Sequence, residues 1–260
     1  MLTCLEKEEE IIKKHDDQIL FIILLCKDSQ FENNLKPFNI QILGKKMWEW
    51  ILPVAGNYEV KTTSYSSESN ILQAIKPLLT SAKHTVVLFS STPLITNQTV
   101  LNALEYVKAK DSNILVLPKG YIFNTEYAKT ADSITGTPTN LFGVYEFMEV
   151  STPESLANAQ NVLRKRILEF HQKQGVILDS PETTWIDAEV VIEKNVKICA
   201  NNTIRGKTLI CKNAILDVGN LITDSIILQG ALIIMSSVQK SKISENMVVG
   251  PFEKIENQNV

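Results

Sequence analysis

Residues 185–225 decide the fold of the C-terminal part, and they read WIDAEVVIEKNVKICANNTIRGKTLICKNAILDVGNLITDS. Aliphatic residues recur at every sixth position of this stretch: Ile186, Ile192, Ile198, Ile204, Ile210, Leu216 and Ile222. Neither a helix nor an ordinary strand has this period, whereas a parallel β-helix does, because each hexapeptide supplies one short strand and one corner. At three repeats per coil, residues 185–255 should form about four coils, with a register shift after Ser225.

The sequence before this repeat alternates between strand and helix patterns. Short apolar runs predict buried strands over residues 18–26, 84–90 and 113–117. Helical spacing of apolar residues predicts helices over residues 69–79, 97–110 and 153–173. This alternation favours an α/β layered domain. The predicted organisation is an N-terminal helical extension (1–17), an α/β domain (18–152), a linker helix (153–175) and a β-helix (176–260).

Composition narrows the class of function. The 26 basic residues against 29 acidic ones give a net charge of −3, which disfavours general nucleic-acid binding. The four cysteines show no CxxC spacing and the three histidines are scattered, so neither a zinc site nor a disulfide framework is suggested. The longest apolar run, residues 19–26, is too short to span a bilayer, and the charged N-terminal stretch does not resemble a signal peptide. We therefore expect a cytoplasmic protein that binds neither nucleic acid nor membrane.

Two C-terminal segments resemble a known enzyme family. QNVLRKRILEFHQKQGVILDSPETTWIDAEVVIEKNVKI (160–198) is similar to the junction of the bifunctional N-acetylglucosamine-1-phosphate uridyltransferase / glucosamine-1-phosphate acetyltransferases, and SENMVVGPFEKI (244–255) resembles their Gly-Pro-Phe corner. More weakly, residues 20–51 and 86–95 resemble the strands that carry the nucleotide-binding loops of that family. The resemblance implies a shortened Rossmann-like domain of the nucleotide-diphospho-sugar transferase type, followed by a left-handed parallel β-helix of hexapeptide repeats.

The loops that bind the nucleotide in that family are altered here. The first loop is glycine-rich in the family so that backbone N–H groups approach the phosphates, and this chain has Cys26 and Asp28 at the two glycine positions. Lys27 is retained, but Gln30 replaces the arginine. The lysine of the following Pro-Lys pair has its counterpart in Lys36, in reversed order.

The remaining ligand positions are altered as well. The resemblance places Ser91 where the family has its Mg²⁺-binding aspartate and Pro153 where it has the second metal ligand. The base-reading loop corresponds to residues 66–68, and Lys45 to the lysine of a Gly-Lys pair that keeps a turn. The residues that could still contact a nucleotide or sugar phosphate are Lys27, Asp28, Lys36, Lys45, Ser67 and Ser91. No catalytic residue and no dedicated metal ligand is assigned.

The second activity of the family is not expected either. Its acetyltransferase residues lie in coils beyond the Gly-Pro-Phe corner, and residues 176–260 contain no histidine that could act as the base. His171 lies on the linker helix, where a surface or packing role is expected.

The sequence leaves three functions open. The first is a degenerate nucleotidyltransferase-like pseudoenzyme, a trimer formed through the β-helix, that regulates or scaffolds a protein partner or binds a nucleotide sugar. The second is an active sugar-1-phosphate uridyltransferase with an altered site, in which Asp28 could hold a metal and Mg²⁺ would be the cofactor. The third is a hexapeptide-repeat acyltransferase. No cofactor is assigned for the first reading.

Overall fold

The computed structural model describes residues 19–27, 36–68 and 70–260. The chain divides into two compact units, one comprising Met1–Gln41 and Lys46–Ala159, the other Ile42–Lys45 and Gln160–Val260. The division falls inside helix α5 (Pro153–Lys173), whose bounds are those predicted from the sequence. The helix expected over residues 1–17 lies outside the described residues.

The first unit is built on a five-stranded sheet in the order β4-β1-β5-β7-β6. Its strands are β1 (Ile19–Cys26), β4 (Glu59–Tyr65), β5 (His84–Phe89), β6 (Ile114–Leu117) and β7 (Gly120–Asn124). β1 pairs in parallel with both β4 and β5, and β7 is antiparallel to β5 and β6. The α/β class predicted for this region is confirmed.

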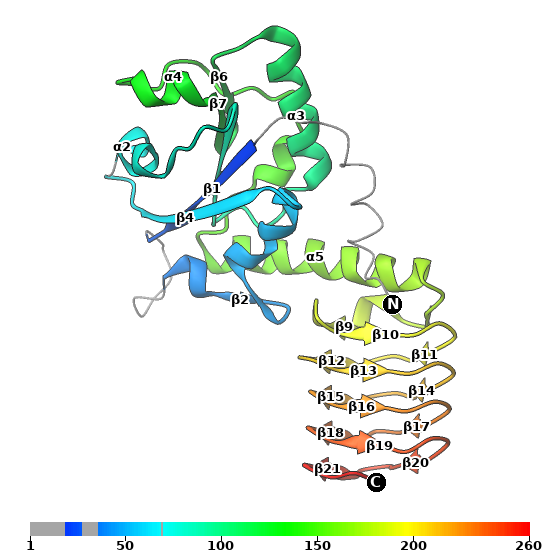
Figure 1. The fold of residues 1–260 in the computed structure, drawn as a ribbon. Helices are drawn as coiled ribbons and strands as arrows, with labels where there is room; N and C mark the ends of the chain where they lie inside the picture. Colours follow the sequence, from blue (N-terminus) through cyan, green and yellow to red (C-terminus); the bar gives the residue numbers. More distant parts are fainter. Residues whose placement is uncertain (1–18, 28–35, 69) are drawn as a thin grey trace. The chain divides into compact units, whose positions relative to one another are not determined.

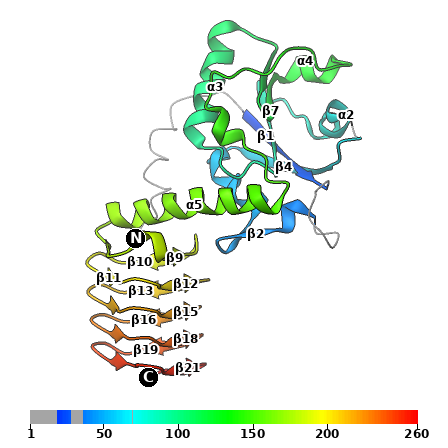
Figure 2. The same ribbon diagram turned by 180° about the vertical axis from the view of Figure 1, so that it is seen from behind.

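Helices cover both faces of this sheet. α3 (Asn97–Lys110) lies on one face, and α2 (Ile71–Ile75) and α4 (Thr125–Thr130) lie on the other (Figures 1 and 2). Alternate residues of β1 enter two separate apolar cores: Ile19, Phe21 and Ile23 on the α3 side, Leu20, Ile22 and Leu24 on the other. An almost unbroken apolar run is therefore what a strand buried on both faces requires.

Short 3-10 helices complete the first unit. They are η1 (Pro37–Asn39), η2 (Met47–Trp50), η3 (Leu52–Ala55), η4 (Lys76–Leu78) and η5 (Val144–Phe147). Pro53 and Pro77 stand in the first turn of η3 and η4, where a missing N–H costs nothing. The helix expected over 69–79 is accordingly shorter, because the chain passes from α2 into η4 at Lys76.

The second unit is a parallel β-helix (Figure 1). One sheet contains β8 (Ile177–Leu178), β11 (Lys197–Ile198), β14 (Ile215–Leu216), β17 (Leu232–Ile233) and β20 (Val248–Val249). The second contains β9 (Trp185–Ile186), β12 (Thr203–Arg205), β15 (Leu221–Thr223), β18 (Ser237–Gln239) and β21 (Lys254–Glu256). The third contains β10 (Val191–Ile192), β13 (Leu209–Ile210), β16 (Ile226–Ile227) and β19 (Lys242–Ile243). η6 (Pro181–Thr183) precedes β9.

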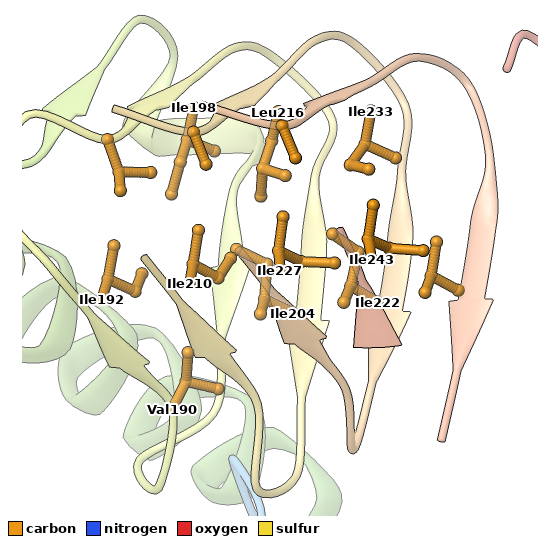
Figure 3. Close-up of a cluster of buried hydrophobic side chains, with 14 of the residues drawn as sticks. Val190, Ile192, Ile198, Ile204, Ile210, Leu216, Ile222, Ile227, Ile233 and Ile243 are labelled. Atoms are coloured by element: carbon orange, nitrogen blue, oxygen red, sulfur yellow. The ribbon is translucent and has the colours of Figure 1, made fainter. Parts of the chain in front are cut away.

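The hexapeptide isoleucines form the core of this unit. Ile186, Ile198, Ile204, Ile210 and Ile222 have no exposed surface. The side chains of the last four stack along the interior of the coils (Figure 3). The predicted register shift is confirmed, because Ile227 rather than a residue six positions after Ile222 points inward.

Two ladders of buried polar side chains reinforce the corners. In one, Asn220 Nδ2 donates to Asn202 Oδ1 (2.9 Å), and Ser236 N donates to Asn220 Oδ1 (2.9 Å). In the other, Ser241 N donates to Ser225 Oγ at 3.1 Å. Each rung satisfies backbone groups that a tight corner leaves unpaired inside the protein.

The turn of a hairpin from early in the chain, Ile42–Lys45, belongs to this second unit. The hairpin is formed by β2 (Gln41–Ile42) and β3 (Lys45–Lys46), and Leu43 O accepts a 3.0 Å hydrogen bond from Ala188 N. Gly44 has a φ of +84°, and a Cβ there would lie 3.0 Å from the Asp187 side chain. Glycine is therefore required for the turn, as the Gly-Lys pair suggested.

Arg164 ties α5 to the first coil. Its Nη1 donates to the carbonyl oxygens of Pro181 (2.7 Å), Glu182 (3.0 Å) and Thr184 (3.3 Å). Its guanidinium carbon lies 5.0 Å from the centre of the Trp185 ring. Arg164 thus has a structural role at the start of the β-helix. No helix in the described part of the chain is long and apolar enough to cross a membrane.

Candidate ligand site at the carboxyl edge of the sheet

The first unit has a topological switch point between β1 and β5. The chain leaves β1 toward β4 on one side, and then crosses to β5 on the other side of β1. In open α/β sheets ligands bind outside the carboxyl ends of strands at such a point. Lys27 follows β1, Ser67 follows β4 and Ser91 follows β5, so three of the predicted site residues lie at this edge.

Backbone contacts fix the edge. Cys26 N donates to Ser90 Oγ at 2.9 Å, and Lys27 N donates to Tyr65 O at 2.9 Å. Cys26 Sγ lies 3.7 Å from Ser91 Oγ. The β1–loop junction is therefore tied to both of its neighbouring strands, and the thiol that replaces a loop glycine is buried against Ser91.

Ser91 belongs to a cluster that the sequence did not reveal. Its buried hydroxyl donates to Glu149 Oε1 at 3.1 Å, and its carbonyl accepts from Val150 N at 2.7 Å. The other carboxylate oxygen of Glu149 accepts from Lys119 Nζ at 2.9 Å. We call Ser91, Glu149 and Lys119 the carboxyl-edge cluster.

Aromatic rings lie beside this cluster. Lys119 Nζ is 4.9 Å from the centre of the Phe89 ring, within cation–π range. The Phe89 ring in turn contacts Tyr65 (5.4 Å between centroids) and Tyr121 (6.3 Å). Burial raises the pKa of Tyr121, with a smaller opposing effect from the positive charge of Lys119. The ammonium group of Lys119 is thus held from two directions, by a carboxylate and by a ring face.

Other predicted residues are not part of the cluster. Lys36 is exposed just before η1, and Lys45 lies in the hairpin turn, which belongs to the second unit. Asp28 lies outside the described residues. Glu149 and Lys119 were missed because each stands in a connecting segment without a motif around it. Only the fold brings Glu149 to Ser91, 58 positions earlier in the chain.

The Mg²⁺ that the family resemblance implies does not fit the described cluster. Mg²⁺ prefers carboxylate and water oxygens in octahedral geometry. Ser91 offers a neutral hydroxyl, and the one carboxylate beside it is already bonded to an ammonium group. Among the described residues no group of three or more His, Cys, Asp or Glu side chains could hold a metal ion.

Comparison of the sequence with curated proteins finds similarity to the bifunctional protein GlmU of several bacteria. No protein-family model matches the chain. The bifunctional protein GlmU of Streptococcus gordonii is 36% identical over 110 residues, 42% of this chain and 24% of that protein. GlmU of Caldanaerobacter subterraneus subsp. tengcongensis is 35% identical over 115 residues (44% and 25%), and GlmU of Clostridium novyi 37% identical over 110 (42% and 24%). The match spans about a quarter of the length of these relatives.

Solved structures similar to this chain include a synthetase and a cytidylyltransferase. One is CMP:2-keto-3-deoxy-manno-octonic acid synthetase complexed with CTP, with a TM-score of 0.43, 12% identity, and coverage of 57% of this chain and 99% of that one. The other is 2-C-methyl-D-erythritol 4-phosphate cytidylyltransferase from Thermus thermophilus, with a TM-score of 0.41, 14% identity, and coverage of 55% and 98%. The chain, which joins an α/β unit to a parallel β-helix, is therefore similar to GlmU over about two fifths of its own length.

Proposed function

We propose that this protein is a degenerate nucleotidyltransferase-like subunit that binds a nucleotide sugar without turning it over and assembles through its β-helix. The observation that carries the proposal is the carboxyl-edge cluster. A neutral serine, an ion-paired glutamate and a lysine stand at the switch point, where phosphoryl-type transfer would need charge neutralisation by metal and arginine. Each such group that is lost typically costs orders of magnitude in rate.

The β-helix supports the assembly part of the proposal. Several outward-facing residues of its sheets are apolar and exposed, among them Ile177 (53%), Val191 (52%) and Val248 (61%). Apolar side chains on regular flat faces are suited to contact with identical faces of a second copy. We propose a trimer, a nucleotide sugar or a protein as further partner, and a cytoplasmic location.

The competing function is an active sugar-1-phosphate uridyltransferase with an altered site and Mg²⁺ as cofactor. The test is pyrophosphate release from UTP and N-acetylglucosamine 1-phosphate with Mg²⁺, with the GlmU of Streptococcus gordonii as the active control. We expect no release above background for this protein. Turnover approaching that of the control would overturn the proposal and establish the competing function.

The same preparations test acyl transfer. Residues 176–260 contain no histidine, and the thiols of Cys199 and Cys211 have raised pKa values, chiefly through burial, which disfavours the nucleophilic thiolate. We expect no acetyl transfer from acetyl-coenzyme A to glucosamine 1-phosphate. Transfer above background would favour the acyltransferase reading.

A further inference from the structure

Lys119 places a fixed positive charge at the carboxyl edge of the sheet. Its ammonium group lies 2.9 Å from Glu149 Oε2, and Glu149 Oε1 accepts from the buried Ser91 hydroxyl at 3.1 Å. The Phe89 ring lies below the ammonium at 4.9 Å. These contacts restrict a side chain that would otherwise sample many rotamers, so part of the entropy of ordering it is lost before any ligand arrives.

We propose that Lys119 is a tethered cation that replaces a divalent metal, so that the site binds the phosphate groups of its ligand without Mg²⁺. A divalent ion at Glu149, the carboxylate of the cluster, would stand beside the positive charge of the Lys119 ammonium group, which repels it. A lysine ammonium carries three N–H donors, and the contact with Glu149 uses one. The others are available to phosphate oxygens on the side away from Glu149.

A second ammonium group reinforces the choice of a phosphate ligand. Lys27 is exposed directly after β1, at the same edge as Ser91, and Ser67 follows the adjacent β4. Two lysines at the same edge of the sheet suit a ligand that carries several anionic oxygens. The inference rests on the proposed function, because it takes that ligand to be a nucleotide sugar.

The experiment is calorimetric titration of the full chain with UDP-N-acetylglucosamine, in EDTA and in Mg²⁺. We expect binding in EDTA that Mg²⁺ changes by less than about twofold. Lys119→Met should weaken it about tenfold to a hundredfold, the range for a lost charge-assisted hydrogen bond. Lys119→Arg should retain most of the affinity. Lys129→Met removes the same charge from an exposed pair with Glu126 and should change nothing.

The variant Glu149→Gln distinguishes between two hypotheses, phosphate binding by Lys119 and metal binding by Glu149. Glutamine keeps an oxygen that can accept from the Lys119 ammonium group and removes a charge that repels phosphate, so if Lys119 binds the ligand, binding should be unchanged or tighter. If Glu149 is a metal ligand, the same variant should abolish Mg²⁺-dependent binding. Binding that requires Mg²⁺, equal affinity in Lys119→Met, or no binding in either buffer would overturn the inference. Mg²⁺-dependent binding without pyrophosphate release would overturn it while leaving the proposed function intact.

Discussion

His171 shows at the scale of one residue how burial fixes a protonation state. It lies near the end of α5, is 3% exposed and packs against Phe170, with 5.2 Å between ring centroids. Its Nδ1 has no hydrogen-bond partner within the described part of the chain. Burial lowers its pKa from 6.5 to about 4. This is the packing histidine that the sequence suggested, and it is kept neutral in the fold.

A neutral buried histidine predicts acid sensitivity. Because the pKa is lower in the folded chain than in the unfolded one, stability is complete above about pH 6.5 and falls as the pH drops toward 4. The loss is about 3 kcal/mol at full protonation, since each pKa unit corresponds to about 1.4 kcal/mol. Glutamine does not titrate, so His171→Gln lacks this acid-dependent loss of stability. The difference in unfolding free energy between the wild type and the variant, measured with urea, should therefore become smaller between pH 7 and pH 4.5. Parallel pH profiles of the two proteins would contradict this.

Two corner glycines differ in what surrounds them. Gly206 has a φ of +62°, and a Cβ there would clash with the Asp224 carboxylate. Gly219 has a φ of +73°, but its nearest neighbour, Met235 Cγ, would lie 3.9 Å away. We expect Gly219→Ala to cost about 1 kcal/mol through left-handed backbone alone, and Gly206→Ala clearly more. Equal losses in urea unfolding would show that Asp224 moves aside freely.

The candidate site could be predicted only in part from single residues. Lys27, Ser67 and Ser91 were identified from the resemblance to the nucleotide-binding loops of the uridyltransferase family, and the structure places them just beyond β1, β4 and β5. Glu149 and Lys119 had no such signal. Their role depends on a tertiary contact with Ser91 that no local pattern encodes.

At the scale of elements, the polar ladder limits how the coils can vary. Asn220 is 2% exposed, and its Nδ2 lies within hydrogen-bond distance of Asn202 Oδ1 (2.9 Å), Asp217 O (2.7 Å) and Ile233 O (3.1 Å). Its Oδ1 accepts from Ser236 N. Removal of the side chain leaves several buried groups of adjacent coils unpaired.

Asn220→Ala should therefore destabilise the protein by about 3 kcal/mol or more. The matched control is Asn102→Ala, which makes the same substitution at an exposed position of α3. It should cost nothing measurable, because alanine is the better helix former. Both variants are compared by urea unfolding. A loss below about 1 kcal/mol for Asn220→Ala would mean that water replaces the amide in the corner.

Helices and strands could be predicted where buried apolar residues form a continuous run or stripe, and they were missed where such a pattern is absent. β1, β5 and α3 were found because apolar residues fill whole strands or recur on one helical stripe. β4 was missed because it is an edge strand whose residues are all exposed or half-buried, so it has no apolar run. β7 was missed because its reversal after β6 takes only two residues, which merges the two strands in the sequence pattern.

For the whole molecule, the second unit was easier to predict than the first. Each coil of the β-helix repeats one local pattern, and stacked neighbours bury it, so the period alone identifies the architecture. The sheet of the first unit depends on which strands pair across long crossovers. No repeat in the sequence encodes its strand order, β4-β1-β5-β7-β6.

The proposed trimer can be tested by substitutions on the outer faces of the β-helix. The sheet of β8, β11, β14, β17 and β20 presents Ile177, Ile215 and Val248 outward, at 53%, 40% and 61% exposure, with Lys197, paired with Asp179, between Ile177 and Ile215. If this face packs against a second copy, lysines there would be buried without partners, at a cost that one interface cannot offset. We expect the wild type to sediment at three times the 29.2 kDa chain mass, and Ile215→Lys/Val248→Lys as a single chain.

The control is Ile215→Val/Val248→Ile, which keeps these two positions apolar and should keep the trimer. Circular dichroism and a thermal melt of each variant separate dissociation from unfolding, because the two lysines replace outward side chains and leave the inner core untouched. A trimeric lysine variant would place the contact on another sheet of the β-helix. A wild type of single-chain mass at micromolar concentration would contradict assembly itself, and would leave nucleotide-sugar binding in the α/β unit as the function to pursue.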